Sequence, residues 1–168
     1  MRTVICTIFA ACVLITGTVV ASEKEDLFPS TSTDSSNWHR YRFYVSNFGS
    51  DLATNEVFTL LWDNPAAAVL LAIYDTSEAA NPELVALSVG NDRLARIEVG
   101  LMDGTYQLIV IGVAEPTHYH MNAIYAPDES IFRQPDGQPF NVITQTTDLQ
   151  IEKLLAPRVR QLEKAVNQ

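Results

Sequence analysis

The fold is decided by a stretch near the middle of the chain, Leu94-Ala95-Arg96-Ile97-Glu98-Val99-Gly100-Leu101, which continues through Met102-Asp103-Gly104-Thr105 into Tyr106-Gln107-Leu108-Ile109-Val110-Ile111-Gly112-Val113. In the first run apolar and polar residues alternate, as they do in a strand with one buried face and one wet face. The second run is apolar on both faces, which is typical of a strand covered on both sides. The Asp-Gly pair between the runs predicts a hairpin, because glycine accepts a positive φ at little cost.

The same kind of pattern recurs on both sides of this stretch. Strand-like runs are expected at about 38–46, 56–63, 68–75, 84–89 and 117–125, separated by short turn-rich segments. In the last run, alternation turns Tyr119 and Met121 inward and His118 and His120 outward. We therefore predict an all-β fold, an antiparallel, jelly-roll-like β-sandwich of about seven strands that spans residues 38–127.

Within this region the order of the motifs resembles a known family. An aromatic entry strand is followed by Phe58-Thr59-Leu60, by an apolar strand ending Ile73-Tyr74-Asp75, and by Gly104-Thr105-Tyr106 opening another apolar strand. This order is similar to the bacterial pre-peptidase C-terminal domain, a jelly-roll-like sandwich that also resembles the collagen-binding modules of secreted collagenases. The resemblance covers Trp38 to about Pro127 and implies a module of the kind that accompanies secreted enzymes. Where that family often carries acidic residues, this chain has Ala66-Ala67-Ala68-Val69-Leu70-Leu71, which removes candidate calcium ligands.

The N-terminus has the pattern of an export signal. A positive start at Met1-Arg2 is followed by an apolar run from Val4 to Val20, and Val19-Val20-Ala21 supplies the small residues of a cleavage site. We predict a signal peptide at 1–21 and a secreted or periplasmic protein. Uncleaved membrane anchoring is the alternative, because a run of this length can just span a bilayer. Both cysteines, Cys6 and Cys12, lie inside this segment, so the mature chain would contain neither a disulfide nor a catalytic thiol.

The segments that flank the sandwich differ from it in composition. Residues 22–37 are polar and are expected to form a linker, and residues 128–147 are turn-rich and are expected to form a surface loop. From Asp148 to Gln168 the spacing predicts an amphipathic helix that Pro157 kinks or splits. Its apolar stripe consists of Ile151, Leu155, Val159, Leu162 and Val166. We expect this helix to dock on the sandwich, with self-association or partner binding through it as the alternative.

The net charge and the motifs of the chain limit the classes of function that we expect. The formal net charge is −9, and an acidic chain repels phosphate backbones, so we expect no nucleic-acid partner. We find no nucleophile elbow, phosphate loop or zinc-binding His-Glu-x-x-His helix. The sequence therefore favours an exported, non-catalytic module that binds a protein or a polysaccharide. The predicted ligand-binding residues are Tyr44, Arg40 and Arg42, which share the outward face of the first strand.

Two metal sites are the alternatives to a cofactor-free module. His118 and His120 project from one strand face, where alternate residues can chelate one ion, with His39 or an acidic loop residue as a candidate third ligand. Such a pair would make the protein a small metal-binding protein or a metal-dependent enzyme. A calcium site would need the carboxylates at the strand ends to gather at one end of the sandwich, although turns also favour aspartate for backbone reasons. These carboxylates are Asp51, Asp63, Asp75, Asp92 and Asp103.

Overall fold

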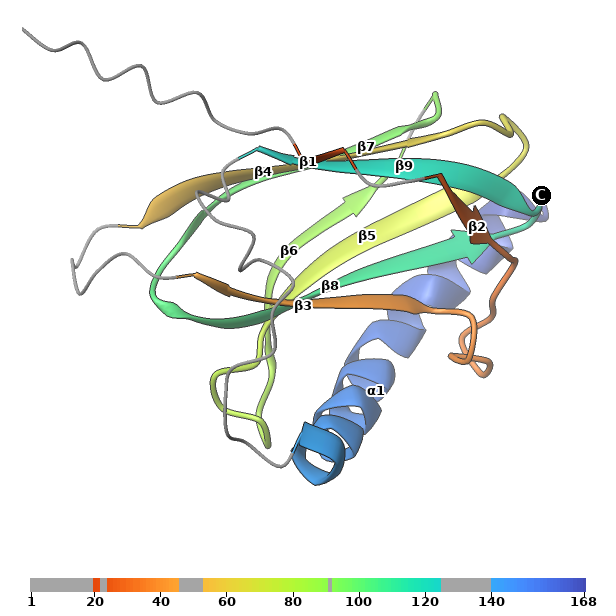
Figure 1. The fold of residues 1–168 in the computed structure, drawn as a ribbon. Helices are drawn as coiled ribbons and strands as arrows, with labels where there is room; N and C mark the ends of the chain where they lie inside the picture. The colour runs from red at the N-terminus through yellow and green to blue at the C-terminus, as the bar shows by residue number, and fades with distance from the viewer. Residues whose placement is uncertain (1–19, 22–23, 46–52, 91, 125–139) are drawn as a thin grey trace, which may run out of the picture.

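The computed structural model describes residues 20–21, 24–45, 53–90, 92–124 and 140–168, which form strands and one C-terminal helix (Figure 1). The strands are β1 (Val20–Ala21), β2 (Glu25–Leu27), β3 (His39–Val45), β4 (Thr54–Trp62), β5 (Ala68–Asp75), β6 (Glu83–Val89), β7 (Leu94–Leu101), β8 (Gly104–Val113) and β9 (Thr117–Ile124), and the helix is α1 (Phe140–Val166). The strands β3 to β9 lie where the sequence predicts seven strands. None of the described helices is long and apolar enough to cross a membrane.

The strands form two antiparallel sheets that pack face to face. One sheet has the order β2-β9-β4-β7, with β1 also paired to β9, and the other has the order β3-β8-β5-β6. Eight strands divided between two sheets in this order form a jelly roll. The predicted all-β, jelly-roll-like sandwich with a C-terminal helix is therefore confirmed.

The sandwich interior is filled by alternate residues of both sheets. Leu108 and Val110 of β8 point into the core between the sheets, together with Tyr119 and Met121 of β9. Ile109 and Ile111 of β8 point to the opposite side, into a second apolar cluster. A strand that is apolar on both faces is thus covered on both faces, as its sequence predicts.

The cover on the second face is α1, which lies across the outer side of the β3-β8-β5-β6 sheet (Figure 1). Ile151, Leu155 and Val159 are fully buried against this sheet and Leu162 is partly buried, which confirms docking of the predicted stripe except for Val166, which is exposed. The helix begins at Phe140, inside the segment predicted as a loop, and it continues through Pro157 without being split. An interior proline costs about 3 kcal/mol, and burial of the large apolar side chains on either side of it contributes roughly 1.5–3 kcal/mol each.

The segment predicted as a linker, 22–37, is largely built into the fold. β2 pairs with β9, Leu27 is buried in the core, and Ser30 donates its backbone N–H to the carbonyl oxygen of Gly112 at 2.8 Å. The edge of β9 exposes backbone groups that need partners, and β2 supplies them. Residues 128–139 of the predicted loop and residues 1–19 of the predicted signal peptide lie outside the described residues.

Candidate functional site

The side chains of the short strand β2 alternate between the inner and the outer face of the sheet edge. Glu25 turns toward the sandwich interior, Asp26 turns outward to His118, and Leu27 turns inward again. Leu27 sits directly on the backbone of Gly112, where an added Cβ would come within 2.8 Å of the leucine Cγ. The chain can cross from one sheet to the other here because glycine leaves room for the leucine.

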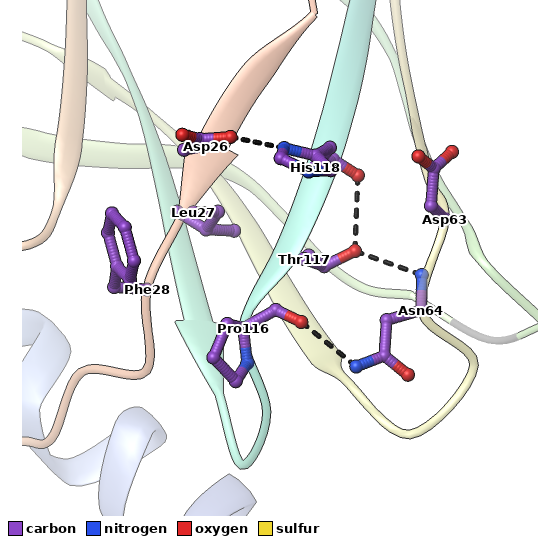
Figure 2. A pocket seen from close by; sticks show the side chains of 8 residues that line it. All are labelled: Asp26, Leu27, Phe28, Asp63, Asn64, Pro116, Thr117 and His118. Atoms are coloured by element: carbon purple, nitrogen blue, oxygen red, sulfur yellow. Dashed lines mark hydrogen bonds and ion pairs between the residues drawn. The ribbon is translucent and has the colours of Figure 1, made fainter.

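Beside β2 the surface is hollowed, with a volume of about 210 Å³ (Figure 2). The lining residues come from β2, the β4–β5 turn and the start of β9: Asp26, Leu27, Phe28, Asp63, Asn64, Pro116, Thr117 and His118. Phe28 is 54% exposed, although it follows a leucine that is 1% exposed. An aromatic ring therefore lies open to solvent at the rim of a mostly apolar depression.

Hydrogen bonds hold the turn and the strand start around this hollow. Thr117 Oγ1 accepts the backbone N–H of Asn64 at 3.0 Å, and the Asn64 side-chain amide donates to the carbonyl oxygen of Pro116 at 2.9 Å (Figure 2). Each of these bonds joins a side chain on one wall to a backbone group on the other wall, so the two walls hold each other in place.

The hollow carries two carboxylates, each with a basic neighbour. Asp26 forms an ion pair with His118 when the imidazole is protonated, and Asp63 forms one with Lys24. The hydrogen bond from Lys24 lowers the pKa of Asp63, and the charge of Lys24 lowers it further. Both of these ion pairs are exposed to water, where such pairs contribute little to stability and exchange readily. The carboxylates can therefore change partners when a cationic group approaches.

On the inner side of β2, a partly buried polar cluster links the two sheets. Tyr119 donates to Glu25 Oε2 at 3.0 Å, and its hydroxyl lies 2.7 Å from His39 Nδ1. The Tyr41 hydroxyl also bonds the Glu25 carboxylate and the Tyr119 hydroxyl. Burial raises the pKa of both tyrosines well above the usual value, so both phenols stay protonated. No local pattern in the sequence points to this cluster, because Glu25 lies in the segment predicted as a linker.

The predicted ligand surface of Tyr44, Arg40 and Arg42 is not open. Arg40 donates to Glu152 of α1 at 2.8 Å, and Arg42 bonds both carboxylate oxygens of Asp148 at 3.1 and 3.2 Å. The two arginines thus face outward as predicted, but they bind the docked helix. Tyr44 alone of the three remains exposed.

The histidine pair is placed as predicted, but its proposed third ligand is not. His118 and His120 are exposed on the outer face of β9. His39 lies on the other side of the sheet, against the Tyr119 hydroxyl, so it cannot complete a site with them. Within the described residues, no three His, Cys, Asp or Glu side chains are grouped to hold a metal ion. Metal binding by the pair itself stays a prediction.

The strand-end carboxylates do not gather at one end of the sandwich. Asp63 and Asp92 lie at one end of the sandwich. Trp62, which precedes Asp63, donates its backbone N–H to the carbonyl oxygen of Arg93, which follows Asp92. Asp75 and Asp103 lie at the opposite end, where both raise the pKa of Tyr106. Asp75 Oδ1 accepts the backbone N–H of Ser77 at 2.8 Å, which is the ordinary turn role of aspartate. Asp51 lies outside the described residues, and a calcium site stays a prediction.

The fold and the hollow define an all-β jelly-roll protein with a small surface depression at a sheet edge. No protein-family model and no curated protein matches the chain, so the resemblance to the pre-peptidase C-terminal domain also stays a prediction. Among solved structures, the Yersinia pseudotuberculosis-derived mitogen matches with a TM-score of 0.43 and 10% identity, over 71% of this chain and 92% of that chain. A likeness at this level says nothing of function.

Proposed function

We propose that this protein is an exported, non-catalytic β-sandwich module that binds a protein or a polysaccharide through the hollow beside β2. The observation that carries the proposal is the exposed ring of Phe28 at the rim of this depression. Large aromatic side chains with open faces dominate recognition of sugars, cationic groups and peptides. The export part of the proposal rests on the N-terminal sequence.

The size of the hollow favours contact with one group of a larger ligand. Pockets that enclose a whole small molecule usually measure roughly 300–1,000 Å³. A hollow of about 210 Å³ is smaller, and it suits a single side chain or one sugar ring of a polymer. Asp26 and Asp63 at its walls favour a cationic or hydroxyl-rich group, since carboxylates accept hydrogen bonds from both.

The chemistry of the cluster next to the hollow also favours binding over catalysis. A tyrosine that acts as a nucleophile or base needs a lowered pKa, whereas burial raises the pKa of Tyr41 and Tyr119. The Glu25 carboxylate accepts from both phenols, so the cluster holds β2 in place.

The test is a peptide and glycan array probed with the full chain, followed by titration of the best ligand. Phe28→Ala and Asp63→Asn are expected to weaken binding at least about tenfold, the equivalent of about 1.4 kcal/mol. Tyr44→Ala, which removes an exposed aromatic ring on the other sheet, is the matched control and should bind as the wild type does. Loss of binding in the Tyr44 variant with full binding in the Phe28 variant would move the site to the other sheet.

A further inference from the structure

The two sheets have four lateral edges, and the described residues cover them unequally. The outer edge of β9 is covered by β1 and β2. In the described part of the chain β1, β2, β3, β6 and β7 each pair on one side only, so each presents backbone groups on its other side. Such an edge is a template for pairing with a further strand unless charged residues or other devices prevent it.

Short length or charge protects three of the four edges. At the edge of β9, β1 has only two residues and β2 begins with two acids. β3 carries Arg40 and Arg42, and β7 carries Arg96 and Glu98. β6 has the sequence Glu-Leu-Val-Ala-Leu-Ser-Val, with no charged residue after Glu83. Exposed edge strands without internal charge are the ones that recruit another strand.

β6 is also left open on its outward face. α1 packs on β5 and β8, and the next strand, β6, exposes Leu84 to 41% and Val89 to 43%. A register shift against β5 occurs between Ile73 and Tyr74, opposite Val85, and the residues from Ala86 to Val89 then pair with β5 in unbroken register. The half of the edge from Ala86 to Val89 therefore keeps a regular register, and apart from Ser88 it is apolar.

We infer that β6 is a self-association edge through which two copies of this chain pair antiparallel, joining their four-stranded sheets into one continuous sheet. With a two-fold axis beside Leu87, Ala86 lies opposite the partner's Ser88 and Val85 lies opposite the partner's Val89. Two of these pairs, Leu87 with the partner's Leu87 and Val85 with the partner's Val89, are apolar cross-strand pairs, and Ala86 meets a small serine. A two-fold contact uses the same patch on both copies, and this patch is self-complementary.

Electrostatics selects this edge for a second copy. The chain has a formal net charge of −9, so two copies approach best where charge is sparse. The two Glu83 residues would lie four positions from the axis in opposite directions, a separation of roughly 27 Å along the strands. This distance exceeds the Debye length of about 10 Å at 0.1 M salt, so their repulsion is screened. Self-pairing of β3 about its centre would instead bring the Arg42 residues of the two copies together.

The first experiment measures the mass in solution of the full chain by sedimentation across a concentration series. The wild type is expected to be a dimer, and Val89→Lys is expected to weaken dimerisation at least about tenfold, since edge lysines block strand pairing. Leu154→Lys, at a leucine on α1 that is 53% exposed, is the control and should remain dimeric. A monomeric wild type, or a dimer that Leu154→Lys or Arg96→Glu dissociates while Val89→Lys does not, would overturn the inference.

The second experiment maps the axis directly. In the full chain with Cys6→Ser and Cys12→Ser no cysteine remains, so a single Leu87→Cys substitution reports on the partner alone. Residues opposite themselves across an antiparallel pair lie about 4.5–5.5 Å apart at Cα, within reach of a disulfide. Mild oxidation should give a covalent dimer with Leu87→Cys and none with Leu154→Cys, and the reverse result would place the interface on α1. Phe28→Ala leaves this edge untouched, so a failed dimer and a failed ligand site are distinguishable.

Discussion

Among the described residues, Glu56 is the one acidic side chain that the fold buries. It is 4% exposed and lies on β4 on the same face as Phe58, Leu60 and Trp62, which point into the core. Burial alone raises the pKa of Glu56 to about 7, because the charged carboxylate loses its hydration. The alternation of β4 already predicts that Glu56 shares the inward face with Phe58.

Replacing Glu56 by glutamine should stabilise the protein at high pH and have little effect at low pH. The pKa in the folded state lies above the usual 4.5, so the neutral acid is favoured by folding. The full free energy of unfolding is therefore retained below about pH 4.5, where Glu56 is neutral in both states, and part of it is lost as the pH rises through about 7. Since one pKa unit corresponds to about 1.4 kcal/mol, Glu56→Gln should gain on the order of 2–3 kcal/mol at pH 8.

The measurement is urea denaturation of both proteins at pH 5 and pH 8. Glu98→Gln removes an exposed carboxylate from the neighbouring strand and should show no such pH dependence. A Glu56→Gln shift of equal size at both pH values would mean that the carboxyl is not neutralised by folding.

At the scale of elements, β2 acts as the eighth strand of the jelly roll although it is only three residues long. Leu27→Ala should destabilise the protein by about 2–4 kcal/mol, because it leaves a cavity over Gly112 in the core. Phe28→Ala, at the next residue, should change stability by less than about 0.5 kcal/mol, because its ring is exposed. Thermal and urea denaturation of the two variants measures this difference. Equal effects on stability would show that β2 does not pack on the sandwich.

The helix α1 offers a second pair of neighbouring residues with opposite surroundings. Leu155 is fully buried in the cluster beneath the helix, and Leu154 is 53% exposed. Leu155→Ala should cost about 2–4 kcal/mol, and Leu154→Ala should cost little. The readout is the urea midpoint of each variant. If the two leucines proved equivalent, α1 would be undocked in solution, and its apolar stripe would be free for a partner.

At the scale of the whole molecule, the sequence predicts the strands and helices whose apolar residues recur at a regular spacing. It does not predict the contacts between residues that are far apart in the chain. The strands β3 to β9 and the stripe of α1 were predictable because burial repeats every two residues in a strand and every three to four in a helix. β2 was not, because three residues in which two acids precede Leu27 carry no period. Arg42 was predicted to bind a ligand because its partner, Asp148, lies 106 residues away.

The hollow was missed for the same reason. Its walls come from three segments that are far apart in the sequence, and the exposure of Phe28 depends on how β2 leaves the sheet. The charge partners His118 and Asp26 are likewise brought together only by the pairing of β2 with β9. An aromatic residue in a polar segment was the single local signal that pointed to this place.

The N-terminal boundary of the folded domain provides the last prediction. Cleavage after Ala21 would remove β1, which pairs with β9 through Val20 and Ala21 only, and would keep β2 with its pairing to Thr117, His118 and Tyr119. A chain that begins at Ser22 should therefore melt within a few degrees of the full chain. A chain that begins at Pro29 loses Leu27 from the core and Glu25 from the tyrosine cluster.

That second truncation should cost at least about 3 kcal/mol, which lowers the melting temperature by roughly 10 °C for a chain of this size. Circular dichroism melts of the three chains give the comparison, and the intact mass of the protein isolated from its native cells gives its natural first residue. Equal melting temperatures of the two truncated chains would show that β2 does not contribute to the stability of the sandwich. If instead the chain that begins at Ser22 already shows this lower melting temperature, β1 belongs to the folded domain. A signal peptide that ends at Ala21 would then be incompatible with this fold.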